Sequence, residues 1–176
     1  MAITWKIDPA HSEIQFKVKH LMITTVTGYF KTFDLEVETD TEDFNTATRI
    51  EFTADINSID TNNQQRDTHL KSADFFDAET HSQLRFVGRK YEGGGDEAKL
   101  HGDLTIRGIT KPVTVDVEFG GTVVDPYGQH KAGFTIKGKI SRKEFGLTWN
   151  AVTEAGQVVV SDDIRLLAEI QLVRQG

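Results

Sequence analysis

Histidine is the residue of this chain whose chemistry most readily supports catalysis or metal binding. Six are present, at His11, His20, His69, His81, His101 and His130. A metal site on a helix commonly uses two histidines four residues apart, and no pair in this chain has that spacing. Their spacing does not indicate that they meet in the folded chain. The sequence therefore predicts no metal site and favours histidines that take part in hydrogen bonds.

The densest polar segment runs from Arg66 to His69. On a helix these two side chains are three positions apart and are neighbours on its surface. The guanidinium of Arg66 suits a phosphate or carboxylate group, and His69 can donate or accept a hydrogen bond near neutral pH. Two interpretations stay open. Either these side chains bind the polar group of a ligand, or Arg66 or Asp67 pairs with another residue, for instance Arg142, and pins the helix in place.

Two other motifs match catalytic or phosphate-binding sequences only in part. Asp8, His11 and Ser12 are close in sequence, but the chain has no GxSxG motif to present a nucleophilic serine. The glycines at 93–95 lack the lysine and the helix of a phosphate-binding loop, so they indicate a hairpin turn. With no cysteine, thiolate nucleophiles, thiolate metal sites and disulfides are excluded. We therefore expect no catalytic residue and no cofactor.

Charge and hydropathy limit the partners and the compartment. The 176 residues carry 20 Lys and Arg against 27 Asp and Glu, a formal net charge of −7. An acidic chain without basic blocks is a poor nucleic-acid binder. No apolar run is long enough to cross a bilayer, and no signal peptide is visible. We expect a cytoplasmic protein, with a periplasmic or secreted location open if the chain is a trimmed mature form.

The elements that must position these residues are mainly strands. Val, Ile and Thr supply 47 residues and Ala only 11, a bias typical of β-sheets. Apolar and polar residues alternate in eight segments, at 12–19, 28–38, 50–56, 84–86, 100–108, 113–119, 132–140 and 164–172. This period of two predicts antiparallel strands with one buried and one solvated face.

Breaks in the alternation predict the remaining elements. The phase slips between Phe30 and Phe33, which indicates a β-bulge. Lys111-Pro112 is expected to interrupt a strand pair. Thr61 and Gln64 have the spacing of a capping box, so a short helix is predicted from Gln64 to Ser72. A second irregular turn is expected at 142–148.

Eight amphipathic strands can close into a barrel or stack as two sheets. The long strands favour an antiparallel β-barrel with one or two short helices, formed by residues 1–176 as one domain. Small residues recur on the inward phases, including Ala54, Gly102 and Gly138. They either leave volume for a guest molecule or relieve crowding inside the barrel.

Four strings of the chain resemble the YceI-like family. They are DPAHSEIQFKVKH, SIDTNNQQRDTHLKSADFFD, LHGDLTIRGITKPV and ISRKEFGL, and they cover nearly the whole chain in order. The resemblance implies a lipocalin-like barrel that binds polyisoprenoids or other long amphiphilic lipids inside. It also implies a homodimer as one possible assembly. The chain departs from the family at His81-Ser82, where an aromatic-Pro pair is usual, and it lacks the signal peptide of many exported relatives.

With this resemblance, inward apolar side chains are expected to bind the lipid tail. They are Phe16, Val18, Phe30, Phe52, Ala54, Phe86, Leu104, Phe119, Phe134, Ile136 and Leu166. The same aromatic residues would form an ordinary core in a barrel without a ligand. The head group is expected to contact Arg66, His69, His20 and Arg142.

Three function hypotheses follow. The leading one is non-enzymatic carriage or sequestration of a long-chain isoprenoid or other fatty amphiphile. The alternative is a lipid-modifying enzyme, of cyclase or isomerase type, with His20 as the histidine best placed by its phase. A third is a two-sheet adhesion module with a filled interior.

Overall fold

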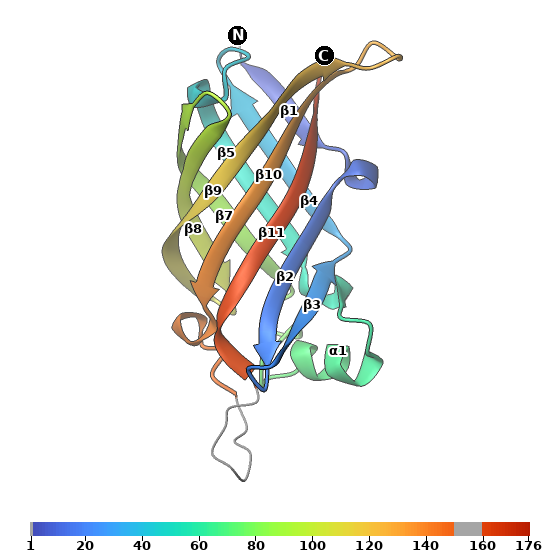
Figure 1. The fold of residues 1–176 in the computed structure, drawn as a ribbon, viewed down its shortest axis with the longest axis vertical. Coiled ribbons are helices and arrows are strands. Elements are labelled where there is room, and N and C mark those ends of the chain that lie inside the picture. The colour runs from blue at the N-terminus through green and yellow to red at the C-terminus, as the bar shows by residue number, and fades with distance from the viewer. Residues whose placement is uncertain (1, 150–159) are drawn as a thin grey trace.

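The structure is a computed structural model that describes residues 2–149 and 160–176 (Figure 1). Its strands are β1 (Ile3–Ile7), β2 (Glu13–His20), β3 (Thr24–Phe30), β4 (Phe33–Thr39), β5 (Ala47–Asp55), β6 (Ile59–Asp60), β7 (Gln83–Gly94), β8 (Glu97–Ile106), β9 (Ile109–Val124), β10 (His130–Ser141) and β11 (Val160–Arg174). The helices are α1 (Gln64–Lys71) and the short 3-10 turns η1 (Pro9–His11), η2 (Phe44–Thr46), η3 (Ile56–Ser58) and η4 (Arg142–Phe145).

The sheet closes on itself as an antiparallel barrel. Neighbouring strands follow the order β1-β4-β5-β7-β8-β9-β10-β11, and β11 pairs in turn with β1. β2 and β3 continue β1 and β4 beyond a break; β2 pairs along the other part of β11, and β3 pairs with β2. Counting each broken pair as one strand, the barrel has eight long strands, as the alternation predicts. The predicted eight-stranded barrel with short helices is confirmed, and the two-sheet alternative is wrong.

Both N-terminal strands are interrupted at the same level of the barrel wall. The expected bulge between Phe30 and Phe33 is wrong: β3 ends at Phe30 and β4 begins at Phe33. The connecting residues bond sideways, with the Lys31 N–H donating to the Ser58 carbonyl and the Asp55 N–H donating to Thr32. These hydrogen bonds replace the strand-to-strand hydrogen bonds at residues 31 and 32, so the chain bends there.

The expected interruption of a strand pair at Lys111-Pro112 is wrong. This pair lies within β9, where Pro112 is opposite Asp103, and the chain reverses at Arg107 and Gly108, which both have positive φ. Pro112 is tolerated because β10 pairs with β9 only from Asp116 onward. The missing N–H of proline therefore costs no ladder hydrogen bond on that side.

The helix prediction is confirmed with a different cap. α1 spans Gln64–Lys71, and the side chain of Asn63, rather than Thr61, accepts the first free backbone N–H from Arg66 at 3.0 Å. The irregular turn expected at 142–148 is η4 followed by Gly146 in the left-handed conformation. α1 and η4 both lie at the barrel end opposite the chain termini (Figure 1).

Candidate ligand cavity

An apolar cavity of about 180 Å³ runs inside the barrel. Side chains from nine of its strands line it, β2 to β5 together with β7 to β11. Seven of the eleven residues expected to contact a lipid tail are among the lining: Phe30, Phe52, Phe86, Leu104, Phe134, Ile136 and Leu166. Gln15 and Tyr91 are the only lining side chains with a polar atom among the described residues.

Aromatic rings close the cavity at the end near the chain termini. Phe44 stands at the centre of this cluster, with its ring 5.0 Å from Trp5, 4.8 Å from Phe134 and 5.9 Å from Phe119. Trp5 is 1% exposed, and its indole Nε1–H donates to the Thr39 hydroxyl at 3.1 Å. Because that polar atom is satisfied, the cluster can stay buried as a plug.

Four of the expected tail-binding residues do not line the cavity. Phe16 packs beside Phe30, with ring centres 5.5 Å apart, in the core at the α1 end. Ala54 is fully buried in that core, and Val18 lies near the end of β2, opposite Val26. Phe119 joins the aromatic plug, because the pairing of β9 with β10 shifts register there.

Three glycines on inward phases make room for a neighbouring side chain rather than for a bound ligand. A Cβ built on Gly28 would lie 2.2 Å from the Phe16 ring, and one on Gly102 would lie 2.4 Å from the Phe86 ring. A Cβ on Gly138 would lie 2.8 Å from Val115. At these positions the crowding interpretation of the small residues is confirmed, and the cavity lies between the larger side chains.

Phe44 and Tyr91 line the cavity although the alternation does not place them on the inner face. Phe44 sits in η2, which has no strand period. Tyr91 lies beyond a register shift in β7, between Gly88 and Lys90, that moves odd positions to the inside. Burial raises the pKa of the Tyr91 hydroxyl, with a smaller contribution from Asp43 in the same direction. The alternation of apolar and polar residues does not predict this register shift, although glycine within a strand often marks a bulge.

Arg66 and Asp67 pin the start of α1 to the chain just before it. The Arg66 Nε–H donates to the Thr61 hydroxyl at 2.8 Å, and a second guanidinium N–H donates to the Thr61 carbonyl at 2.5 Å. Asp67 accepts from both the Thr61 N–H and its hydroxyl. The pinning interpretation is therefore supported, with Thr61 as the partner in place of Arg142.

Arg142 is buried, with 2% of its surface exposed, and its guanidinium is bound by backbone carbonyls. Its Nε–H donates to Ser161 at 2.9 Å, and one terminal nitrogen donates to Leu147 at 2.5 Å and to Trp149 at 2.8 Å. The other terminal nitrogen donates to Val160 at 3.3 Å. Burial lowers the pKa of Arg142, and the nearby Asp162 carboxylate opposes that shift. The side chain joins η4 to the start of β11.

His69 stands between aromatic rings at the same end of the barrel. Its ring centre is 4.8 Å from Trp149 and 5.0 Å from Phe75, and its Nε2 lies 2.9 Å from Asp74. The side chain is 39% exposed. Of the four residues expected at a head group, His69 and Arg142 thus share Trp149 as a neighbour. His20 is exposed at the end of β2, and Arg66 is bound to Thr61.

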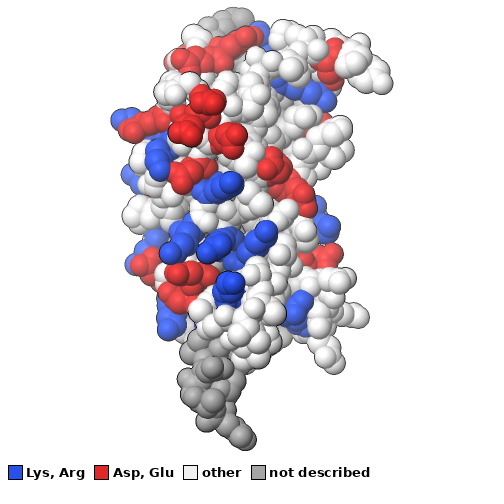
Figure 2. Space-filling view, in the orientation of Figure 1, with Lys and Arg blue, Asp and Glu red and all other residues white. Residues whose placement is uncertain are grey.

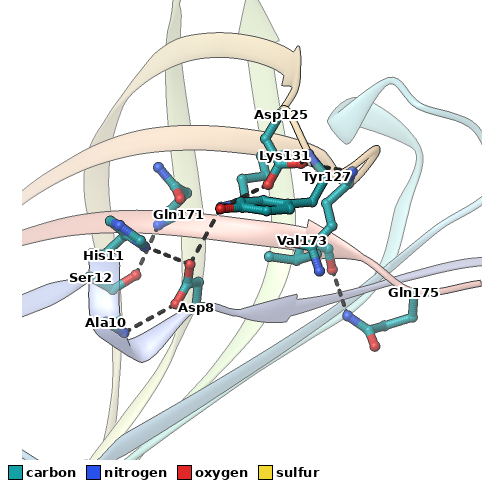
Figure 3. A network of polar contacts seen from close by, with 11 residues as sticks. Asp8, Ala10, His11, Ser12, Asp125, Tyr127, Lys131, Gln171, Val173 and Gln175 are labelled. Atoms are coloured by element: carbon teal, nitrogen blue, oxygen red, sulfur yellow. Dashed lines mark hydrogen bonds and ion pairs between the residues drawn. The ribbon is translucent and has the colours of Figure 1, made fainter.

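The Asp8-His11-Ser12 motif is part of a structural network at the break between β1 and β2 (Figure 3). The carboxylate of Asp8 accepts from the Ala10 N–H and lies 2.8 Å from Nδ1 of His11. Gln171 of β11 spans the break, since it accepts from the Asp8 N–H and donates its own N–H to the Ser12 hydroxyl. The hydrogen bond with His11 lowers the pKa of Asp8, while partial burial opposes it.

Lys131 extends this network to the β9–β10 hairpin. Its Nζ lies 3.7 Å from the Asp8 carboxylate and 3.4 Å from that of Asp125. Asp125 also accepts backbone N–H bonds from Tyr127 and Gln129 within the hairpin turn. These contacts fasten one strand end to another and present no free nucleophile. Within residues 2–149 and 160–176, no group of three or more His, Asp or Glu side chains is arranged to hold a metal ion.

A closed antiparallel barrel around an apolar cavity is the architecture of the small ligand-binding β-barrels. The YceI-like domain matches residues 5–172, and the chain belongs to the YceI-like family. A UPF0312 protein of Staphylococcus epidermidis is 39% identical over 170 residues, which is 95% of each chain.

Solved structures agree with this assignment. The Campylobacter jejuni YCEI protein is 34% identical over 90% of each chain, with a TM-score of 0.77. A polyisoprenoid-binding domain from Saccharophagus degradans shares the fold at 13% identity, with a TM-score of 0.66 over 97% of this chain and 98% of that one. Within the described residues, no helix is both long and apolar enough to cross a membrane.

Proposed function

We propose that the barrel binds a long-chain isoprenoid or similar amphiphilic lipid, with its tail in the central cavity, and carries or sequesters it without chemical change. The observation that carries this proposal is the apolar lining of a cavity that follows the barrel axis. Each methylene removed from water contributes about 0.8 kcal/mol, so a long tail needs few polar contacts for tight binding. The polyisoprenoid-binding domain with the same fold supports the same ligand class.

The polar end of the ligand belongs at the α1 end of the barrel in this proposal. The opposite end is plugged by Phe44 and its aromatic neighbours. His69 is partly exposed beside Trp149, at the α1 end of the barrel, and its imidazole can hydrogen-bond, so it is our candidate head-group contact. Arg142 shapes this end indirectly, because its donors are largely engaged by carbonyls. Arg66 acts in the same indirect way by holding α1 against Thr61.

The enzyme alternative has less support. A cyclase or isomerase needs an acid and a base that reach the substrate. Among the described residues that line the cavity, Tyr91 is the one with a titratable side chain, and its raised pKa keeps it protonated at neutral pH. His20 is exposed at the end of β2 and is absent from the lining.

Native mass spectrometry of protein purified without added lipid tests the proposal. We expect an adduct whose mass, after organic extraction, matches a long-chain lipid. Delipidated protein should regain the adduct when it is mixed with a polyprenyl phosphate. Protein that stays free of long-chain lipid after both treatments would refute the proposal.

A further inference from the structure

Met22 and Ile23 form an exposed apolar tip between β2 and β3 at the α1 end of the barrel, next to the half-buried Leu21. Met22 is 56% exposed and Ile23 is 76% exposed. The turn is closed by the Ile23 N–H, which donates to the His20 carbonyl at 3.1 Å. Two adjacent large apolar side chains at a hairpin tip gain nothing from water, so their position requires another explanation.

The backbone of this tip is also unfavourable for the residues it carries. Leu21 has φ of 52° and Met22 has φ of 60°, values that hairpin turns usually assign to Asn and Gly. A side chain with a Cβ costs about 1 kcal/mol at such a position. The chain therefore keeps apolar side chains at the tip in spite of the backbone strain.

Unpaired cations lie directly behind the tip, on the outer face of the barrel. Lys17 of β2 is opposite Arg165 of β11, which is opposite Lys139 of β10, so three cations stand side by side across neighbouring strands. Lys139 pairs with Asp163 at 3.4 Å. Among the described residues, no carboxylate lies within ion-pair distance of Lys17, Lys19 or Arg165.

Figure 2 shows Lys and Arg gathered around the middle of the face that β10, β11 and β2 form, with some Asp and Glu beside them. Asp162, the other carboxylate on this part of β11, already accepts hydrogen bonds from the Ser141 hydroxyl and the Lys143 N–H. Like charges placed opposite one another in a sheet are destabilising, and this chain is acidic overall. Lys17, Lys19 and Arg165, which have no carboxylate partner in the described part of the chain, therefore favour an anionic partner.

A second exposed apolar tip among the described residues provides a comparison. Val123, Val124 and Tyr127 are exposed at the β9–β10 hairpin, by 64%, 59% and 90%. Lys131, the cation nearest in sequence, is engaged by Asp8 and Asp125. Of these two tips, the β2–β3 tip is the one that combines apolar side chains with free positive charge.

We propose that the β2–β3 tip docks on an anionic lipid surface, with Met22 and Ile23 inserted among the lipids and Lys17, Lys19 and Arg165 on the head groups. Interfacial segments insert their apolar side chains by about 5–10 Å. Lys19 is three residues from Met22, or about 10 Å along a strand, which places its ammonium at the head-group level. The surface adjoins the α1 end of the barrel, where the proposed function places the polar end of the ligand (Figure 1).

Sedimentation with vesicles tests this docking surface. One set contains equal parts of phosphatidylglycerol and phosphatidylcholine, and the other contains phosphatidylcholine alone. We expect binding to the anionic set, and we expect added salt to weaken it. Lys17→Gln with Lys19→Gln should weaken that binding about 25-fold, since each cation near an anionic membrane contributes roughly five-fold. Met22→Gly with Ile23→Thr should weaken binding roughly ten-fold for each side chain that inserts.

Matched controls separate docking from folding and from ligand binding. Lys6→Gln removes a charge near the other end, and Val123→Thr with Val124→Thr removes the other apolar tip, so both should bind vesicles like the wild type. Met22→Gly relieves a positive φ, so that variant should be at least as resistant to urea as the wild type. No sedimentation with anionic vesicles, or equal losses in test and control variants, would overturn the proposal. Native mass spectrometry of the same variants measures lipid binding in the cavity, so a failure of docking and a failure of ligand binding can be told apart.

Discussion

Removal of the Arg142 guanidinium should destabilise the α1 end of the barrel far more than removal of the partly buried Arg107 guanidinium. In Arg142→Met, four backbone carbonyls lose their donor, and three of those bonds are between 2.5 and 2.9 Å. A hydrogen bond to a charged group contributes about 1.5–3 kcal/mol, and a buried group left without a partner costs about 1–3 kcal/mol. Part of this is offset because the cation no longer has to be desolvated, the effect that lowers its pKa. We expect a net loss of about 3–5 kcal/mol.

Equilibrium urea unfolding, followed by tryptophan fluorescence, measures this loss. Arg107→Met is the matched control, because Arg107 makes one carbonyl bond, to Gly146 at 3.1 Å, on a partly buried side chain. It should cost about 1 kcal/mol. Arg142→Lys should fall between the wild type and Arg142→Met, since lysine keeps the charge but cannot reach several carbonyls in one plane. Equal losses in Arg142→Met and Arg107→Met would refute the assignment of Arg142 as the residue that joins η4 to β11.

Three further predictions concern packing, pH and ligand contact. Gly102→Ala forces a Cβ against the Phe86 ring and should lower the free energy of unfolding, measured in urea, by about 1–3 kcal/mol. Gly133→Ala has open space around it and should be neutral, so equal effects of the two substitutions would contradict the packing. The pKa of Asp8 is held below 3.8, so the ionised carboxylate stabilises the fold fully above pH 3.8 and loses this effect as the pH falls through the lowered pKa. Asp8→Asn should therefore be less stable than the wild type at pH 6, and the two proteins should become equally stable in strong acid. A stability difference between Asp8→Asn and the wild type that grows as the pH falls would contradict this reasoning. His69→Ala should weaken binding of a polyprenyl phosphate more than binding of the uncharged polyprenol, and an equal change for both would remove His69 from the head group.

Strand periodicity predicted the barrel because the same alternation runs through almost every wall segment. It also placed Phe52, Phe86, Leu104 and Ile136 on the cavity side. The period fails where the ladder is irregular, as at Tyr91 after the register shift of β7. β1 went unpredicted although its five residues alternate, with Ile3, Trp5 and Ile7 on one face. The signal was present but short, because the chain turns at Pro9.

The roles of polar residues were harder to predict than their positions. Arg142 and Arg66 were expected at a head group because a guanidinium fork suits phosphate. Arg142 instead donates to backbone carbonyls of the turn that follows it and of β11, and Arg66 donates to the hydroxyl and the carbonyl of Thr61. Nothing in a side chain's type distinguishes a carbonyl partner from a phosphate, since both accept the same hydrogen bonds. Only the folded arrangement of η4, β11 and α1 shows which acceptors lie within reach.

The most direct test of tail binding in the cavity is the mass of lipid that co-purifies with Val115→Phe and with Thr114→Phe. Val115 lines the cavity, and Thr114 is exposed on the outer face of the same strand. Both variants gain the same ring, and thermal unfolding confirms that both are folded. We expect the long-chain adduct to be lost or much reduced in Val115→Phe and unchanged in Thr114→Phe. Full adduct in a folded Val115→Phe protein would contradict it.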